Sequence, residues 1–123
     1  MPIIKVWCLP KMEEYQLRQV HCAIVGAVES VKELKLDGMK DVTCLFPPDS
    51  MAFGLGTEVV IEVTGLFKKP GRTREVRRRL AKLLGQAVAD YVPKAKKVEC
   101  LVYPPFNPAE DGFWSGKAEE DER

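Results

Sequence analysis

The sequence is poor in the residues that commonly bind metal ions. It has a single histidine, His21, and its four cysteines form no CxxC pair. Structural zinc sites need several such ligands at short, regular spacing, so we expect no metal site. The cysteines stand among apolar neighbours, a pattern that favours buried, reduced thiols over a disulfide framework.

Long apolar runs and an excess of charge of one sign are also absent. No run approaches the ~18 apolar residues of a membrane span, and Lys5 interrupts the only apolar stretch near the start. The chain has 19 basic and 18 acidic side chains, a net charge of +1, so no overall field attracts nucleic acid. We therefore expect a cytoplasmic protein whose partners include neither membrane nor nucleic acid.

The 123 residues suit one domain with an ordinary core, since 46% of them are hydrophobic and 30% charged. We expect this domain to span residues 1–116. Residues 117–123 are mostly charged and are predicted to form a C-terminal tail.

Two stretches of the chain repeat one pattern at a shift of 56 residues. Residues 3–7 match 59–63, and residues 42–45 match 98–101, where Cys44 lands on Cys100. The same shift places Pro2 over Glu58. The match predicts two pseudo-repeats, about 2–56 and 58–116.

Each predicted unit is a strand, a helix and a strand. β-branched and aromatic residues indicate strands at 3–9, 42–46, 58–67 and 98–103. Apolar residues spaced by three and four indicate helices from Glu14 until Asp37-Gly38 and from about Val76 until Pro93. The fold class is therefore α+β: a duplicated β-α-β unit whose four-stranded sheet has both helices on one face. Both faces of the first strand are mostly apolar, so a partner subunit is expected to cover the other face.

Three features together resemble the tautomerase superfamily, and most closely its longer members, the macrophage migration inhibitory factor and 5-carboxymethyl-2-hydroxymuconate isomerase. They are Pro2 at the start of a strand inside a duplicated unit, the Met51-Ala52-Phe53-Gly54 segment followed by Thr57-Glu58, and the loop 107–114. The resemblance implies a homotrimer with sites between subunits. It also implies that Pro2 is catalytic and that no cofactor takes part.

The chemistry expected of Pro2 depends on removal of Met1. With Met1 present, the Pro2 nitrogen is a tertiary amide and no base. Without it, the nitrogen is a secondary amine, and burial lowers the pKa of such an amine below its usual value near ~8. A neutral amine takes a proton from the carbon beside a carbonyl and returns it elsewhere. This predicts a tautomerase or isomerase acting on a small keto–enol or unsaturated acid.

The remaining site candidates are cations and aromatic rings. Lys35 and Arg72 are candidates for binding the carboxylate or enolate of an acidic substrate. Phe53, Phe113 and Trp114 are candidates for the apolar wall around an aromatic or unsaturated substrate. The simpler interpretations are solvated charges for the cations and subunit packing for the rings.

Alternative functions remain open. One is a trimeric binding or structural protein of the same fold without catalysis, and another is a dehalogenase or hydratase of unsaturated acids. The arginine-rich second helix, with Arg74 and Arg77 to Arg79, raises nucleic-acid binding as a further reading. A solvated outer helix face is favoured there, because no groove-reading motif accompanies the arginines.

Overall fold

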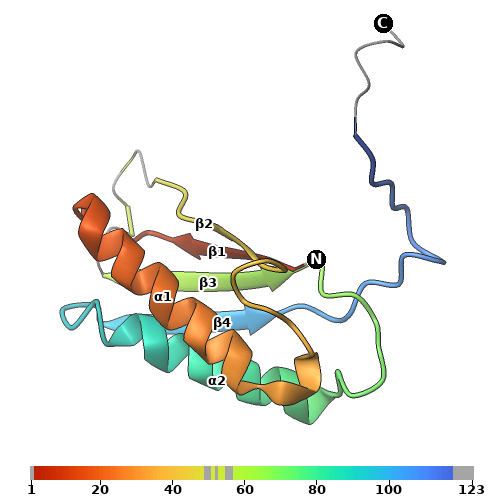
Figure 1. Cartoon of the computed structure of the whole chain (residues 1–123). Helices are drawn as coiled ribbons and strands as arrows, with labels where there is room; N and C mark the ends of the chain where they lie inside the picture. Colours follow the sequence, from red (N-terminus) through yellow and green to blue (C-terminus); the bar gives the residue numbers. More distant parts are fainter. Residues whose placement is uncertain (1, 49–50, 52, 55–56, 118–123) are drawn as a thin grey trace, which may run out of the picture.

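The structure is a computed structural model that describes residues 2–48, 51, 53–54 and 57–117. The elements follow the order β1 (Ile3–Trp7), α1 (Glu14–Ser30), η1 (Lys32–Leu34, a 3₁₀ turn), β2 (Thr43–Leu45), β3 (Glu58–Thr64), α2 (Arg74–Ala89) and β4 (Lys97–Val102). The strands form one sheet in the order β2-β1-β3-β4, in which only the central pair β1–β3 is antiparallel. Both helices lie on the same face of this sheet (Figure 1), so the predicted fold class is confirmed.

The core lies between the sheet and the two helices. Ile4 and Val6 of β1 and Ile61 of β3 are almost fully buried, because alternate residues of a strand point to one face. The helices bury one stripe each, at three- and four-residue spacing. The helical residues of this core are Val20, Ile24, Ala27, Val28, Val76, Leu80, Leu84 and Val88.

The first helix is shorter than the apolar spacing predicts. It ends at Ser30; Val31, just before the 3₁₀ turn, and Leu34, the last residue of that turn, are buried without a continuing α-helix. The predicted stop at Gly38 is therefore wrong. This glycine instead lies against the first helix, where an added Cβ would stand 2.8 Å from Cγ1 of Val25.

The register of the repeat also differs from the sequence match by one residue in the first strands. Ile4 and Val6 are buried and face the helices, as Ile61 and Val63 are, so the first strands of the two units match at a shift of 57. A shift of 56 would align the half-buried Ile3 with the buried Val59. Cys44 and Cys100 pair with Ile4 and Ile61 respectively, so the second strands keep the shift of 56. Pro2 thus corresponds to Val59 and not to Glu58.

The sheet face without helices carries a mixed row of side chains. Leu45, Lys5, Glu62 and Leu101 lie side by side across the four strands, because cross-strand partners share a face. Glu62 accepts hydrogen bonds from Nε1 of Trp7 at 2.5 Å and from the hydroxyl of Tyr103 at 2.7 Å. Both Leu45 and Leu101 are more than two-fifths exposed. The cover that we expect over this face remains a prediction.

The cysteines only partly follow the sequence prediction. None of these four described cysteines forms a disulfide, but Cys22 is exposed and the other three are half-buried, so burial of all four is wrong. Burial raises the pKa of Cys44 to about 11 and that of Cys100 to about 12. Within the described ranges, no helix combines the length and apolarity needed to cross a membrane.

Candidate functional site

Pro2 lies buried at the end of the sheet where the central strand β1 begins. Its carbonyl oxygen accepts a hydrogen bond from the backbone N–H of Thr43 at 3.1 Å. The next residue, Ile3, pairs with Thr43 on one side and with Thr64 on the other. Two neighbouring strands therefore hold the proline in place.

Three phenylalanine rings gather at this same end. The pairing of β3 and β4 continues beyond Thr64, since the N–H of Phe106 donates to the carbonyl of Leu66 at 2.6 Å. Phe67 and Phe106 form a bridge there, with ring centroids 6.1 Å apart. Phe113 meets Phe67 edge to face, at 5.1 Å and 86°. The cluster supplies an apolar wall next to the start of β1.

Arg72 is buried and donates its side-chain hydrogen bonds to backbone carbonyls. Its side chain is only 5% exposed. Nη1 donates to the carbonyl of Phe67 at 2.6 Å, and Nη2 and Nε donate to that of Leu34 at 2.8 and 3.3 Å. Burial lowers the pKa of Arg72, and the nearby carboxylate of Asp41 opposes that change. Arg72 thus joins the aromatic cluster to the loop that carries Lys35.

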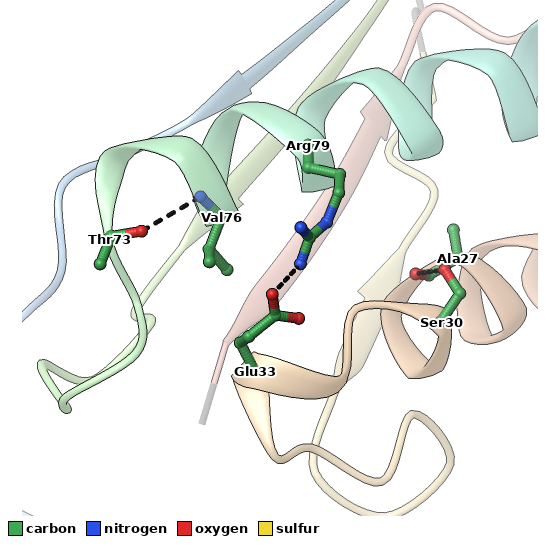
Figure 2. A network of polar contacts seen from close by, with 6 residues as sticks. All are labelled: Ala27, Ser30, Glu33, Thr73, Val76 and Arg79. Atoms are coloured by element: carbon green, nitrogen blue, oxygen red, sulfur yellow. Dashed lines mark hydrogen bonds and ion pairs between the residues drawn. The ribbon is translucent and has the colours of Figure 1, made fainter.

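Lys35 follows that loop's 3₁₀ turn in a left-handed conformation, with φ of 54° and an exposed side chain. Two contacts fix the backbone before it. Arg72 holds the preceding carbonyl, and Glu33 forms an ion pair with Arg79 of α2, which Figure 2 shows. A hydrogen bond from Arg79 lowers the pKa of Glu33. The two predicted cations, Lys35 and Arg72, are therefore neighbours in space.

A basic cavity of about 380 Å³ opens beside Arg72, and its lining contains no acidic residue. Gly71 turns the chain there with φ of 89°, a conformation that side chains rarely adopt. Arg77 is fixed by a hydrogen bond from Nη1 to the carbonyl of Arg72 at 2.6 Å. The full lining is Lys68, Lys69, Pro70, Gly71, Arg72, Thr73, Arg77 and Pro105. Such a lining suits an anionic ligand.

Phe53 lies away from this group, and Trp114, although it follows Phe113 in the chain, is largely exposed. Phe53 is 87% exposed, and the next residue, Gly54, packs against Cys8 just past the far end of β1. The five residues of β1 separate that end from Pro2 by roughly 15 Å. Trp114 is 81% exposed, and its ring lies against Gly116. Of the predicted site residues, one subunit thus brings Pro2, Lys35, Arg72 and Phe113 to one end.

Several solved structures share this fold. A fused 4-oxalocrotonate tautomerase, described as a symmetric trimer, superposes with a TM-score of 0.66 at 19% identity, over 94% of both chains. A malonate semialdehyde decarboxylase superposes with a TM-score of 0.62 at 17% identity, over 94% of this chain and 92% of the other. A second such decarboxylase, inhibited by 3-bromopropiolate, superposes with a TM-score of 0.63 at 18% identity, over 94% of this chain and 91% of the other. No protein-family model and no curated protein matches the chain.

The chain has the tautomerase-superfamily fold. The solved structures that resemble it include 4-oxalocrotonate tautomerases and malonate semialdehyde decarboxylases, which are members of that superfamily. The resemblance suggested by Pro2, the 51–54 segment and the 107–114 loop is thereby confirmed for the architecture.

Within this tautomerase fold, sequence reasoning missed Phe67 and Phe106 as parts of the candidate site. Both lie beyond the regular strands, in a bridge that only the folded sheet reveals. Sequence reasoning also missed Tyr103 and Glu62, whose hydrogen bond joins two strands 41 residues apart.

Proposed function

We propose that the protein is a cofactor-independent tautomerase or isomerase whose base is the amine of Pro2, freed by removal of Met1. One observation carries the proposal: Pro2 is buried at the start of a central strand, at the end where an aromatic cluster and basic groups also lie. The substrate is a small keto–enol or unsaturated acid, acidic or aromatic in character.

The reaction needs only proton movement. The neutral amine removes a proton from the carbon next to the substrate's carbonyl, which leaves an enolate and a protonated Pro2. The ammonium then returns the proton to another carbon of the conjugated system, so the base is restored. Burial supports this role, since it disfavours the charged amine and lowers its pKa.

The basic groups would bind the carboxylate of the substrate and stabilise the negative charge of the enolate. Lys35 is exposed on a loop whose backbone is held, so its ammonium is free to meet a carboxylate. Lys68, Lys69 and Arg77 line the basic cavity nearby. Arg72 already donates to two carbonyls, so we assign it the part of a positioning residue that sets Lys35 and Phe67. Phe113 forms the apolar wall.

We propose a homotrimer as the working form. Three solved structures with this fold are described as trimers, one symmetric and two asymmetric. The open sheet face, with Leu45 and Leu101 exposed, gives such an assembly a surface to cover. Because Phe53 lies at the opposite end from Pro2, it reaches a Pro2 site only from a neighbouring subunit. Trp114 is assigned to the apolar wall around the substrate.

A second candidate is decarboxylation or hydration of a small acid, with protonated Pro2 as the acid. The similarity to malonate semialdehyde decarboxylase favours it, since that protein is described as having decarboxylase and hydratase activities. The pH dependence separates the two: base catalysis rises with pH through the pKa of Pro2, and acid catalysis falls. A non-catalytic trimer is the remaining alternative, and the cytoplasmic location stays a prediction.

The experiment combines intact mass with activity. The untagged protein should weigh one methionine less than the full chain. It should then tautomerise at least one member of a panel of small enol acids, and Pro2→Ala should lose about 10²–10⁴-fold in kcat/KM. Retention of Met1, or equal activity of Pro2→Ala, would overturn the proposal.

A further inference from the structure

A second cavity lies at the opposite end of the sheet from Pro2. Its volume is about 480 Å³, within the range of small-molecule sites, and it is lined by Pro10, Thr57 and residues 91–95. None of these residues belongs to the candidate site described above.

The repeat relates this cavity to the Pro2 end. Residues 91–95 lead from α2 to β4, just as the loop with Lys35 leads from α1 to β2. Pro10 stands two residues after Cys8, whose φ is 66°, and Phe67 stands two residues after Gly65, whose φ is 72°. The cavity is therefore the second unit's counterpart of the site proposed in the first.

The walls of this cavity are held by backbone hydrogen bonds. The carbonyl of Thr57 accepts from the N–H groups of Lys96 and Lys97, at 2.8 and 3.2 Å. Val92 is 5% exposed, and its carbonyl accepts from the N–H of Ala95 at 3.0 Å. The loop that forms the cavity is thus ordered before any ligand arrives, which reduces the entropic cost of binding.

The lining specifies a ligand chemistry. Pro10, Pro93 and the ring of Tyr91, which is 39% exposed, offer flat apolar surface. Lys94 is the one charged residue of the lining, and no carboxylate faces it there. These groups suit a ligand with a planar apolar ring system and a single negative charge.

We propose that the cavity around Tyr91 and Lys94 is a second ligand site, which binds small aromatic carboxylates without converting them. Conversion is absent because Val59 occupies the position equivalent to Pro2, and its nitrogen is a peptide N–H inside the chain. One subunit therefore combines one reactive end with one binding end.

Cinnamate is the probe, because it has the planar carboxylate but no acidic proton next to a carbonyl. Isothermal titration of the full-length protein should show saturable binding below about 10 mM. Lys94→Gln should weaken the Kd about tenfold through loss of a charge-assisted hydrogen bond. Lys82→Gln removes the same charge from the exposed face of α2 and should leave the Kd unchanged. Amide shifts in ¹H–¹⁵N spectra should concentrate in residues 91–95.

Pro2→Ala separates this site from the proposed active site. Binding at Tyr91 and Lys94 should persist in that variant, whether or not the protein is an enzyme. The proposal is overturned if no saturable binding is seen, if Lys82→Gln weakens it as much as Lys94→Gln, or if the shifts map only to the Pro2 end and vanish in Pro2→Ala.

Discussion

The guanidinium of Arg72 donates two hydrogen bonds to the carbonyl of Leu34, 38 residues away, with Nη2 at 2.8 Å and Nε at 3.3 Å. This contact joins the loop before β2 to the turn after β3. It fixes the backbone immediately before Lys35, so a buried arginine sets the place of an exposed lysine at the end of the sheet that holds Pro2.

Arg72→Met should lower the free energy of unfolding by about 2–4 kcal/mol, because it leaves the carbonyls of Leu34 and Phe67 without their donors. Urea denaturation measures this change. Arg78→Met is the matched control, since Arg78 is exposed on α2, and it should change stability by less than ~0.5 kcal/mol. Equal effects of the two substitutions would show that Arg72 does not tie these loops together.

Phe113→Leu should reduce stability by about 1 kcal/mol, since it removes the edge-to-face contact with Phe67. Trp114→Leu should have little effect, because Trp114 is 81% exposed. Thermal unfolding of both variants compares them directly. A larger loss in Trp114→Leu would place that ring in a subunit interface instead.

Tyr103→Phe should destabilise the protein near neutral pH but not at the extremes. The pKa of Glu62 is lowered mainly by its hydrogen bond from Tyr103, and also by the one from Trp7. These bonds therefore stabilise the folded protein above the unfolded pKa of Glu62, near ~4.3, and this stabilisation is lost as pH falls through the lower folded pKa. The bond to Glu62 raises the pKa of Tyr103, so the stabilisation is also lost as pH rises through that higher value. Urea midpoints of the wild type and Tyr103→Phe should therefore converge in acid and in strong base. A difference that is constant with pH would contradict the contact.

Mixed trimers test whether Phe53 acts across a subunit boundary. Pro2→Ala and Phe53→Ala should each be impaired alone. After joint unfolding and refolding at equal amounts, about a quarter of the sites should combine an intact Pro2 with an intact Phe53 from a neighbour, and activity should return accordingly. No recovery would mean that both residues serve the same subunit's site, against the separation seen along β1.

The architecture was predictable because each element has a strong periodic signal. Strands such as β3 alternate buried and half-buried residues, and α2 buries Val76, Leu80, Leu84 and Val88 at regular spacing. Element ends were less predictable. Val31 and Leu34 continue the apolar spacing of α1, but Val31 caps a 3₁₀ turn and Leu34 ends it, and composition alone does not separate an α-helix from such a turn.

The candidate site was predictable only in part. Pro2 stood out because its position at the start of a strand has a chemical consequence. The link between Arg72 and Leu34 was not visible, since it depends on the distance between two turns far apart in the chain. The position of Phe53 at the opposite end likewise follows from the packing of Gly54 against Cys8 and not from any motif.

The central claim is that Pro2 carries a free amine which is neutral at working pH. An ¹⁵N NMR titration of the Pro2 nitrogen in untagged, proline-labelled protein tests it most directly. The account predicts a secondary-amine signal that titrates with a midpoint below ~8, the usual value of a chain-terminal amine. A signal that does not titrate would identify an amide with Met1 still attached, and a midpoint at or above that value would contradict the role of Pro2 as a base.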